Sequence, residues 1–232
     1  AAGSIGQVYR AILVSGQQVA LKVQRPGIEV VVAQDISLIK SLAELVALTE
    51  FGKNFDIVGL AEEFSGALEA ELDFTSEAEY TNQLRQNLTG SEWFNSEQLV
   101  IPQVYEDLTT TKILTIEWLD GVPILNARLP EFRDNKNEAA QRSEITTILF
   151  RAFFKQVYID GFFHADPHPG NIFYLQDGRL AILDCGMIGR LDPRTQQILT
   201  EMLLAIVDLD ARRCSQLTLE LAEGGQQVNL NN

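Results

Sequence analysis

The stretch FFHADPHPGNIFYLQDGRLAILDCG, residues 162–186, decides the interpretation of this sequence. It contains both histidines of the chain, His164 and His168, at alternating positions on either side of Asp166. On a β-strand, that alternation would place the three side chains on one face, as a zinc or iron site requires. Two prolines interleave them, however, and proline fits poorly in a paired strand. A metal centre is therefore the weaker of two interpretations.

The stronger interpretation is a phosphoryl-transfer loop. Protein kinases use the pattern H-R-D-x-x-x-x-N, in which the aspartate orients the reacting hydroxyl and the asparagine holds Mg²⁺. His164, Asp166 and Asn171 have that spacing. The segments NIFYL and LAIL flank an Asp-Gly turn and predict a β-hairpin, which returns the chain to the same site at Asp184. Asp184 opens D-C-G where kinases have D-F-G, so we expect it to be the main Mg²⁺ ligand beside Asn171.

The start of the chain fits the same chemistry. The kinase phosphate loop, G-x-G-x-x-G-x-V, is matched from Ala1 to Val8, with alanine at the first glycine position. The segment VALKV follows, and a strand would put Ala20 beneath the adenine and Lys22 against the α- and β-phosphates. Alone, Lys22 would be read as a solvated strand lysine. The residues expected to bind the nucleotide here are Ala1, Ala2, Gly3, Ser4, Gly6, Val8, Ala20 and Lys22.

A lysine buried against phosphates needs a carboxylate to orient it. The acidic stretch EAELDFTSEAE lies within a helix predicted over residues 59–88 and offers Glu71, Asp73 and Glu77. Asp73 and Glu77 are four residues apart and would share a helix face. The alternative is a solvated acidic face, but Phe74 in the same stretch indicates that one edge is buried.

The remaining pattern predicts an α+β protein of two lobes, residues 1–120 and 121–232. The predicted elements are strands at 4–14 and 17–23, a helix at 27–50, strand-like sequence at 99–124, a helix from Ser143 to Gly161, and helices from Pro193 onward.

Composition excludes several other classes of protein. The chain has 46% hydrophobic and 22% charged residues and a net charge of −14, so it lacks the basic patch that nucleic acid binding needs. No apolar run reaches the about 18 residues of a membrane span. Two cysteines make no disulfide framework, which favours a reducing compartment.

Together these segments resemble the UbiB family of atypical kinase-like proteins, also called the activity-of-bc1-complex family. AAGSIGQVYRA is similar to its alanine-rich loop, VALKVQRPGI to its lysine strand, ELDFTSEA to its Glu-x-Asp motif, and HADPHPGN and LDCG to its catalytic and metal loops. The resemblance covers nearly the whole chain, in the right order. It implies a two-lobed protein-kinase-like fold, with an N-lobe of sheet plus helices and a helical C-lobe.

The resemblance also implies residue roles. Lys22 would pair with Glu77, Glu71 and Asp73 would form the Glu-x-Asp motif, and Asp166 would be the catalytic aspartate. The segment IEWLDG resembles the hinge. The hinge residues expected to hold adenine through the backbone run from Glu117 to Leu119.

The sequence departs from the family pattern in three places. A helical N-terminal extension with a Lys-x-Gly-Gln motif is missing, so we expect a truncated member. Gly3 stands where the family has alanine, which bears on nucleotide preference, and Cys185 replaces the phenylalanine of D-F-G, which changes packing there.

The resemblance implies binding of ATP or ADP with Mg²⁺ and slow ATP hydrolysis, in support of isoprenoid-quinone biosynthesis of the ubiquinone or plastoquinone type, or of lipid homeostasis. Partners would be an isoprenoid lipid or quinone-biosynthesis proteins, with peripheral membrane contact on the cytoplasmic side or in an organelle matrix. Two alternatives stay open: a true protein kinase, although A-P-E and a long activation segment are missing, and a nucleotide-binding pseudoenzyme scaffold.

Overall fold

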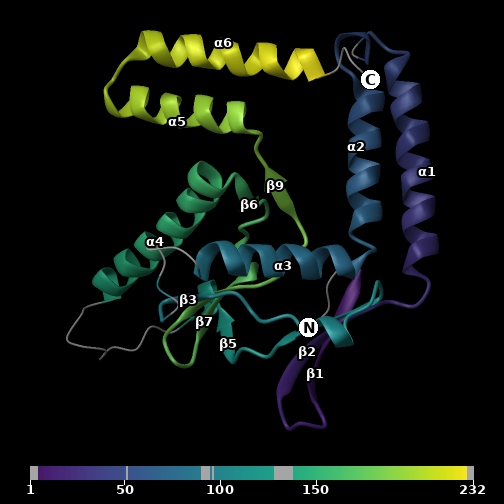
Figure 1. The fold of residues 1–232 in the computed structure, drawn as a ribbon. Coiled ribbons are helices and arrows are strands. Elements are labelled where there is room, and N and C mark those ends of the chain that lie inside the picture. The colour runs from purple at the N-terminus through teal and green to yellow at the C-terminus, as the bar shows by residue number, and fades with distance from the viewer. Residues whose placement is uncertain (1–4, 51, 90–94, 96, 128–137, 229–232) are drawn as a thin grey trace.

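The computed structural model describes residues 5–50, 52–89, 95, 97–127 and 138–228. This part of the chain forms three small sheets and six α-helices. Figure 1 shows how they are arranged. The helices are α1 (Ile28–Ala47), α2 (Ile57–Ala70), α3 (Phe74–Thr89), α4 (Glu138–Lys155), α5 (Pro193–Val207) and α6 (Ala211–Val228). A π-helix, Gln156–Asp160, continues α4 directly. The predicted α+β class is confirmed.

The first sheet carries the lysine strand. Its antiparallel strands, in the order β1-β2-β4, are β1 (Gly6–Ile12), β2 (Gln18–Gln24) and β4 (Ile113–Glu117). Gly16 forms the turn between β1 and β2 at φ 89°, a conformation that glycine adopts without steric penalty. Successive side chains of a strand point to opposite faces, so Ala20 and Lys22 lie on the same face.

Two further sheets bring distant segments together. The second, in the order β3-β8-β7-β5, consists of β3 (Leu99–Val100), β8 (Leu180–Ile182), β7 (Ile172–Leu175) and β5 (Gly121–Pro123). The predicted hairpin is β7 and β8, with Gly178 at φ 88° in its turn. The third pairs β6 (Phe162–His164) with β9 (Ile188–Arg190). Since β3 runs parallel to β8, residues before and after position 120 share a sheet; the division into lobes there stays a prediction.

The described residues form two hydrophobic cores, one beside the first sheet and one beside the second sheet. Helix α3 contributes side chains to both. Near its start, Phe74 and Ala78 pack with Leu114 of β4. Near its end, Leu84 and Leu88 pack with the strands of the second sheet, and both leucines are buried. Burial of one leucine contributes about 2 kcal/mol, so this helix is held firmly at both ends.

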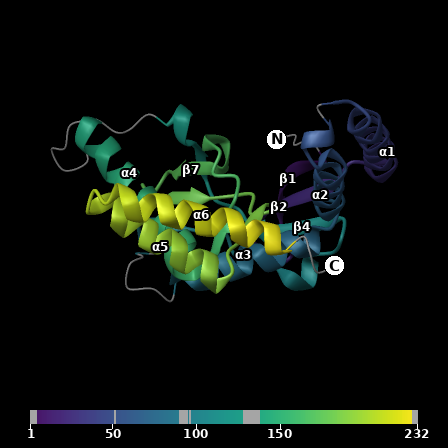
Figure 2. The same cartoon turned by 90° about the horizontal axis from the view of Figure 1, so that it is seen from above.

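Helices α1 and α2 lie side by side as an antiparallel pair at one end of the molecule, and α5 and α6 form a second such pair (Figures 1 and 2). The α1–α2 pair packs chiefly on itself, through Val32, Ile36 and Ala43 of α1 and Ala61 and Ser65 of α2.

Two predicted boundaries were wrong. The helix predicted over 59–88 is two helices, because the Asp73 carboxylate starts α3 anew by accepting a hydrogen bond from Thr75 N–H (2.9 Å). The helix predicted to begin at Ser143 begins at Glu138, and the Ser143 carbonyl accepts the Thr147 hydroxyl inside it. The predicted stop at Gly161 is confirmed, with φ 62° directly after the π-helix.

Candidate active site

The break between α2 and α3 brings the acidic residues to one place. Thr75 donates both its N–H and its hydroxyl to Asp73 Oδ1, at 2.9 and 2.6 Å. Asp73 is therefore a cap of α3 rather than a residue inside one continuous helix, and it lines the same cavity as Glu77. Glu71 is the C-cap residue of α2, and the turn after it lets its side chain line the same cavity as Glu77 of α3. A continuous helix would have pointed Glu71 and Asp73 to different sides.

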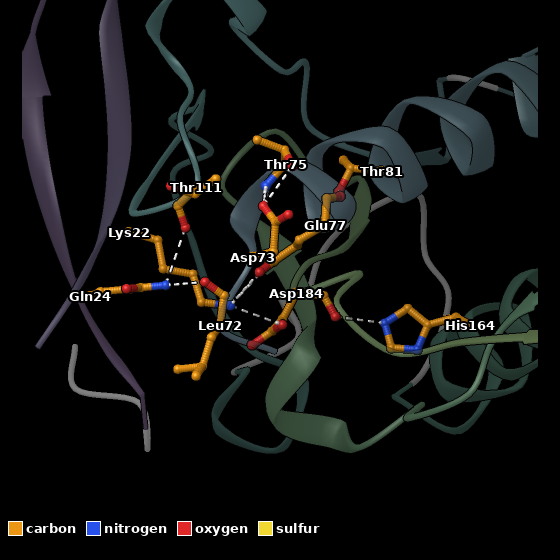
Figure 3. A network of polar contacts seen from close by, with 10 residues as sticks. All are labelled: Lys22, Gln24, Leu72, Asp73, Thr75, Glu77, Thr81, Thr111, His164 and Asp184. Carbon is orange, nitrogen blue, oxygen red and sulfur yellow. Dashed lines mark hydrogen bonds and ion pairs between the residues drawn. The ribbon is translucent and has the colours of Figure 1, made fainter. Parts of the chain in front are cut away.

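Lys22 lies at the centre of the polar network in Figure 3. Its Nζ donates to Glu77 Oε1 and Oε2 at 3.0 and 2.8 Å and lies 3.2 Å from Asp184 Oδ1. The same ammonium lies 5.2 Å from the centre of the Phe74 ring. Glu77 comes from α3 and Asp184 from the loop after β8, so one strand lysine ties the first sheet to both.

The carboxylates around Lys22 compete for a single cation. Burial alone would lower the pKa of Lys22, but attraction to Glu77 and then to Asp184 outweighs it, and the pKa stands above its ordinary value. Burial raises the pKa of Glu77 to about 7 against the pull of Lys22, and repulsion from Asp184 adds to the rise. Burial and Asp184 likewise raise the pKa of Glu71, despite attraction to Lys22. The site thus favours a further positive charge.

His164 fixes the loop around the predicted catalytic aspartate. The Asp166 N–H donates to His164 Nδ1 (3.2 Å), so the imidazole proton lies on Nε2, which donates to the Asp184 carbonyl (3.0 Å). His168 Nδ1 accepts the Gly170 N–H (3.0 Å) and caps a short 3₁₀ turn. The side chains of both histidines therefore bind backbone groups of these loops.

Asp166 and Asn171 lie together, and Asn171 donates its amide N–H to Asp166 Oδ2 (3.1 Å). This leaves the amide oxygen of Asn171 as the group able to bind a cation. Asp184 has φ 55°, a left-handed conformation that aspartate tolerates better than most residues and that often marks a functional position. Its carboxylate is about half exposed, whereas Cys185 beside it is buried in the core.

Lys22, Asp166 and Asp184 border a cavity of about 210 Å³ between the first sheet, α3 and the two loops, and Asn171 is not among its described lining residues. Lys22 is the one cation among its described lining residues, and Glu71, Asp73, Glu77, Asp166 and Asp184 are the carboxylates. Gly6 also lines the cavity, and a Cβ there would lie 3.0 Å from the Val23 carbonyl, so glycine fits this close approach of two strands.

The oxygen donors fit Mg²⁺ held jointly with a nucleotide. Within the described residues, no group of three or more His, Cys, Asp or Glu side chains could hold a metal ion. Mg²⁺ commonly binds through one or two side-chain oxygens plus substrate phosphates, which suits Asn171 and Asp184. The His-Asp-His metal centre gains no such support, since both imidazoles already bind backbone groups.

The predicted nucleotide residues are only partly described. Ala1, Ala2, Gly3 and Ser4 lie outside the described residues. Val8 pairs with Lys22, and Ala20 is buried. In the predicted hinge, Leu119 is half-buried, and Glu117 donates its backbone N–H to the Gln103 carbonyl (2.8 Å), so that N–H already has a partner.

Sequence reasoning missed a support behind the catalytic loop. Gln156, fully buried in the π-helix, accepts the His164 N–H through Oε1 (2.9 Å). Lys155 next to it holds Asp160 (2.6 Å) and the Asn87 carbonyl (2.8 Å), fixing the π-helix against α3. π-helical turns often occur at functional sites, but no motif in the sequence marks this one.

A strand lysine paired with a helix glutamate, above an aspartate–asparagine loop and an Asp-Cys-Gly loop, is the arrangement of the protein-kinase-like fold. The family model described as "ABC1 atypical kinase-like domain" matches residues 1–218. The chain belongs to this family.

Known relatives agree with this assignment. An uncharacterized protein of Synechocystis sp., slr0889, is 66% identical over 99% of this chain and 56% of its own length. A probable protein kinase UbiB of Azotobacter vinelandii is 36% identical over 95% of this chain and 40% of its own. The structure of an Rv3197–erythromycin complex from Mycobacterium tuberculosis superposes with a TM-score of 0.71 at 26% identity, covering 94% of this chain and 52% of that one. The chain thus spans about half the length of these proteins, or less. No helix among the described residues is long and apolar enough to cross a membrane.

Proposed function

We propose that this chain binds Mg-ATP in the cavity around Lys22 and hydrolyses it slowly or transfers its γ-phosphoryl group to a small acceptor. The observation that carries the proposal is the pairing of Lys22 with both Glu77 and Asp184, at 2.8 and 3.2 Å, in a cavity with an excess of carboxylates. Such a site repels a bare nucleotide, so binding should depend on a divalent cation.

In the proposed reaction each side chain has a distinct task. Lys22, oriented by Glu77, binds the α- and β-phosphates, and Gly6 lines the same cavity where a side chain would contact the Val23 carbonyl. Asp166 orients the attacking hydroxyl or water, and Asn171 holds Asp166 in place. Mg²⁺, held by Asn171 and Asp184, would neutralise charge on the phosphates.

The short segment after the metal loop favours a small acceptor over a protein substrate. After Gly186 the chain forms β9 against β6, and α5 begins at Pro193 with Asp192 as its N-cap. This leaves little of the region that protein kinases use to hold a peptide. The resemblance to the UbiB family, whose name one relative carries, is the ground on which we propose a role in isoprenoid-quinone or lipid metabolism at a membrane.

The test is thermal unfolding of the chain with ATP or ADP, with and without Mg²⁺, for wild type and Asp184→Asn. Ligand that binds the folded state raises the melting temperature according to its occupancy. We expect stabilisation by Mg-ATP in the wild type and in the control Asp208→Asn, an exposed carboxylate at the end of α5, but not in Asp184→Asn. Absence of any nucleotide effect in the wild type contradicts the proposal.

A second measurement separates turnover from a nucleotide-binding scaffold. Asp166→Asn should retain the Mg-ATP stabilisation but lose phosphate release, because Asp166 acts on the acceptor rather than on the nucleotide. If the wild type binds Mg-ATP and releases no phosphate above the Asp166→Asn level, the chain is a scaffold.

A further inference from the structure

The π-helix behind the catalytic loop is fixed by contacts on two sides. Lys155 connects it to α3, because its ammonium binds the Asp160 carboxylate at 2.6 and 2.7 Å and the Asn87 carbonyl at 2.8 Å. A π-helix repeats its hydrogen bonds over five residues, which suits a pair five positions apart. From the other side, Gln196 of α5 donates its amide to two carbonyls of the π-helix, both at 3.0 Å. Gln156, the first residue of the π-helix, therefore starts from a firmly held backbone.

The Gln156 side chain is fully buried, and only half of its amide is satisfied. Its Oε1 accepts the His164 N–H at 2.9 Å, but its Nε2 has no hydrogen-bond partner within the described residues. An amide nitrogen that is buried without a partner costs stability. Stability alone thus does not explain a glutamine at this position.

His164 connects Gln156 to both loops of the candidate site. Its ring is buried, its Nδ1 accepts the Asp166 N–H at 3.2 Å, and its Nε2 donates to the Asp184 carbonyl at 3.0 Å (Figure 3). Asp184 has a second support, because its carboxylate lies 3.2 Å from Lys22 Nζ. The bonds from Asn171 to Asp166 lie within one loop and move with it. A change at the His164 peptide should therefore displace Asp166 more than Asp184.

We propose that Gln156 is a positioning residue for phosphoryl transfer: its oxygen holds the His164 peptide, and the His164 ring sets the place of the Asp166 carboxylate. This role rests on the proposed function, in which Asp166 orients the attacking hydroxyl or water. A small displacement of such a group slows the chemical step strongly. Binding of Mg-ATP through Lys22 does not require it.

The test compares Gln156→Met with the matched control Gln196→Met. Both variants replace a glutamine at the π-helix by an apolar side chain of similar length, but only Gln156 accepts the His164 N–H. Gln156→Met exchanges one unpaired buried N–H, at Gln156 Nε2, for another, at His164, so its melting temperature should stay close to that of the wild type. Gln196→Met frees two carbonyls and should lower the melting temperature.

The first readout is the imidazole NMR spectrum of the chain labelled with ¹⁵N-histidine, recorded without nucleotide. The chain has two histidines, so the variant His168→Asn assigns the signals of His164. In the wild type we expect a single His164 tautomer with its proton on Nε2. Gln156→Met should populate the second tautomer as well, because the released peptide no longer keeps Nδ1 against the Asp166 N–H. Gln196→Met should leave the His164 signals unchanged.

The second readout is steady-state hydrolysis of Mg-ATP. Gln156→Met should lower kcat by about tenfold or more and change the KM for ATP by less than about twofold, because Asp166 acts in the chemical step. Gln196→Met should keep the wild-type kcat. A merely structural role of Gln156 would give the opposite order, with the larger loss of activity in the less stable variant.

Either of two results overturns the inference: His164 signals that Gln156→Met leaves unchanged, or a kcat of Gln156→Met equal to that of Gln196→Met. If the wild type itself turns over no ATP, the proposed function fails. A response of the His164 signals to Gln156→Met then still supports the hold on the catalytic loop, since that spectrum is recorded without nucleotide.

Discussion

Helix α3 buries its large apolar side chains, whereas the α1–α2 pair that precedes it in the chain leaves many of its own exposed. Helix α3 buries Phe74, Ala78, Leu84 and Leu88 in two cores. The α1–α2 pair leaves its largest side chains on the surface, Leu60 and Phe64 among them. The comparison indicates that α3, which carries Glu77, is fixed at both ends, whereas the α1–α2 pair packs chiefly on itself.

The largest expected difference between the two regions is in stability. Leu84→Ala in α3 should lower the free energy of unfolding by about 4 kcal/mol, because it leaves a cavity in a closed core. Leu60→Ala in α2 should change it by less than about 0.5 kcal/mol, because that side chain is mostly in solvent. Urea unfolding curves of both variants measure this. Equal losses would mean that Leu60 is buried in solution.

The pH dependence of stability should separate the carboxylates of the two regions. Folded Glu77 has a pKa of about 7, whereas an unfolded glutamate has 4.5, so the folded state holds the proton longer. The free energy of unfolding should therefore fall by roughly 3 kcal/mol as the pH rises from about 4.5 to 7.

Glu77→Gln should remove this slope, since glutamine does not titrate, while Glu63→Gln on α2 should keep it. Unfolding at several pH values gives the slopes. If the slope is unchanged in Glu77→Gln, other groups cause the pH dependence.

The N-terminal caps of α3 and α2 should differ less in their effect on stability. Asp73→Ala removes both hydrogen bonds to Thr75 and should destabilise the protein by about 1 kcal/mol. Asp56→Ala removes the bond from Gly59 N–H (2.8 Å) at the start of α2. Since α2 packs chiefly on α1, we expect faster hydrogen exchange in its first turn and a smaller change in global unfolding. A larger global loss for Asp56→Ala would reverse the comparison.

The smallest expected difference is in the reactivity of the two thiols, and it is measured without a mutation. Burial raises the pKa of the Cys185 thiol to about 12, so iodoacetamide at pH 8 should leave it unmodified in the folded protein. Cys214 in α6 is only partly buried and should react first. Mass spectrometry with and without denaturant counts the modified thiols. Rapid alkylation of Cys185 would show that the loop beside Asp184 opens readily.

Local patterns were enough to predict the parts of the site that lie in one short segment each. The alternation in VALKV predicted that Lys22 shares a strand face with Ala20, and the Asp-Gly turn predicted the hairpin after Asn171. The break before α3 was not evident, because Ala, Glu and Leu favour helix on both sides and only the Asp73 side chain interrupts it. Gln156 was not predicted either, because its role depends on a contact with His164 that folding creates.

The ion pairs of Lys22 also have a kinetic meaning. Its two partners lie 55 and 162 positions away along the chain. Contacts so distant in sequence form late and slowly, because a long loop must close before they contribute. The pocket is then complete only when almost the entire chain has folded. Recovery of nucleotide binding during refolding would thus mark the end of folding, and a fragment that lacks either β2 or the Asp184 loop should recover none of it.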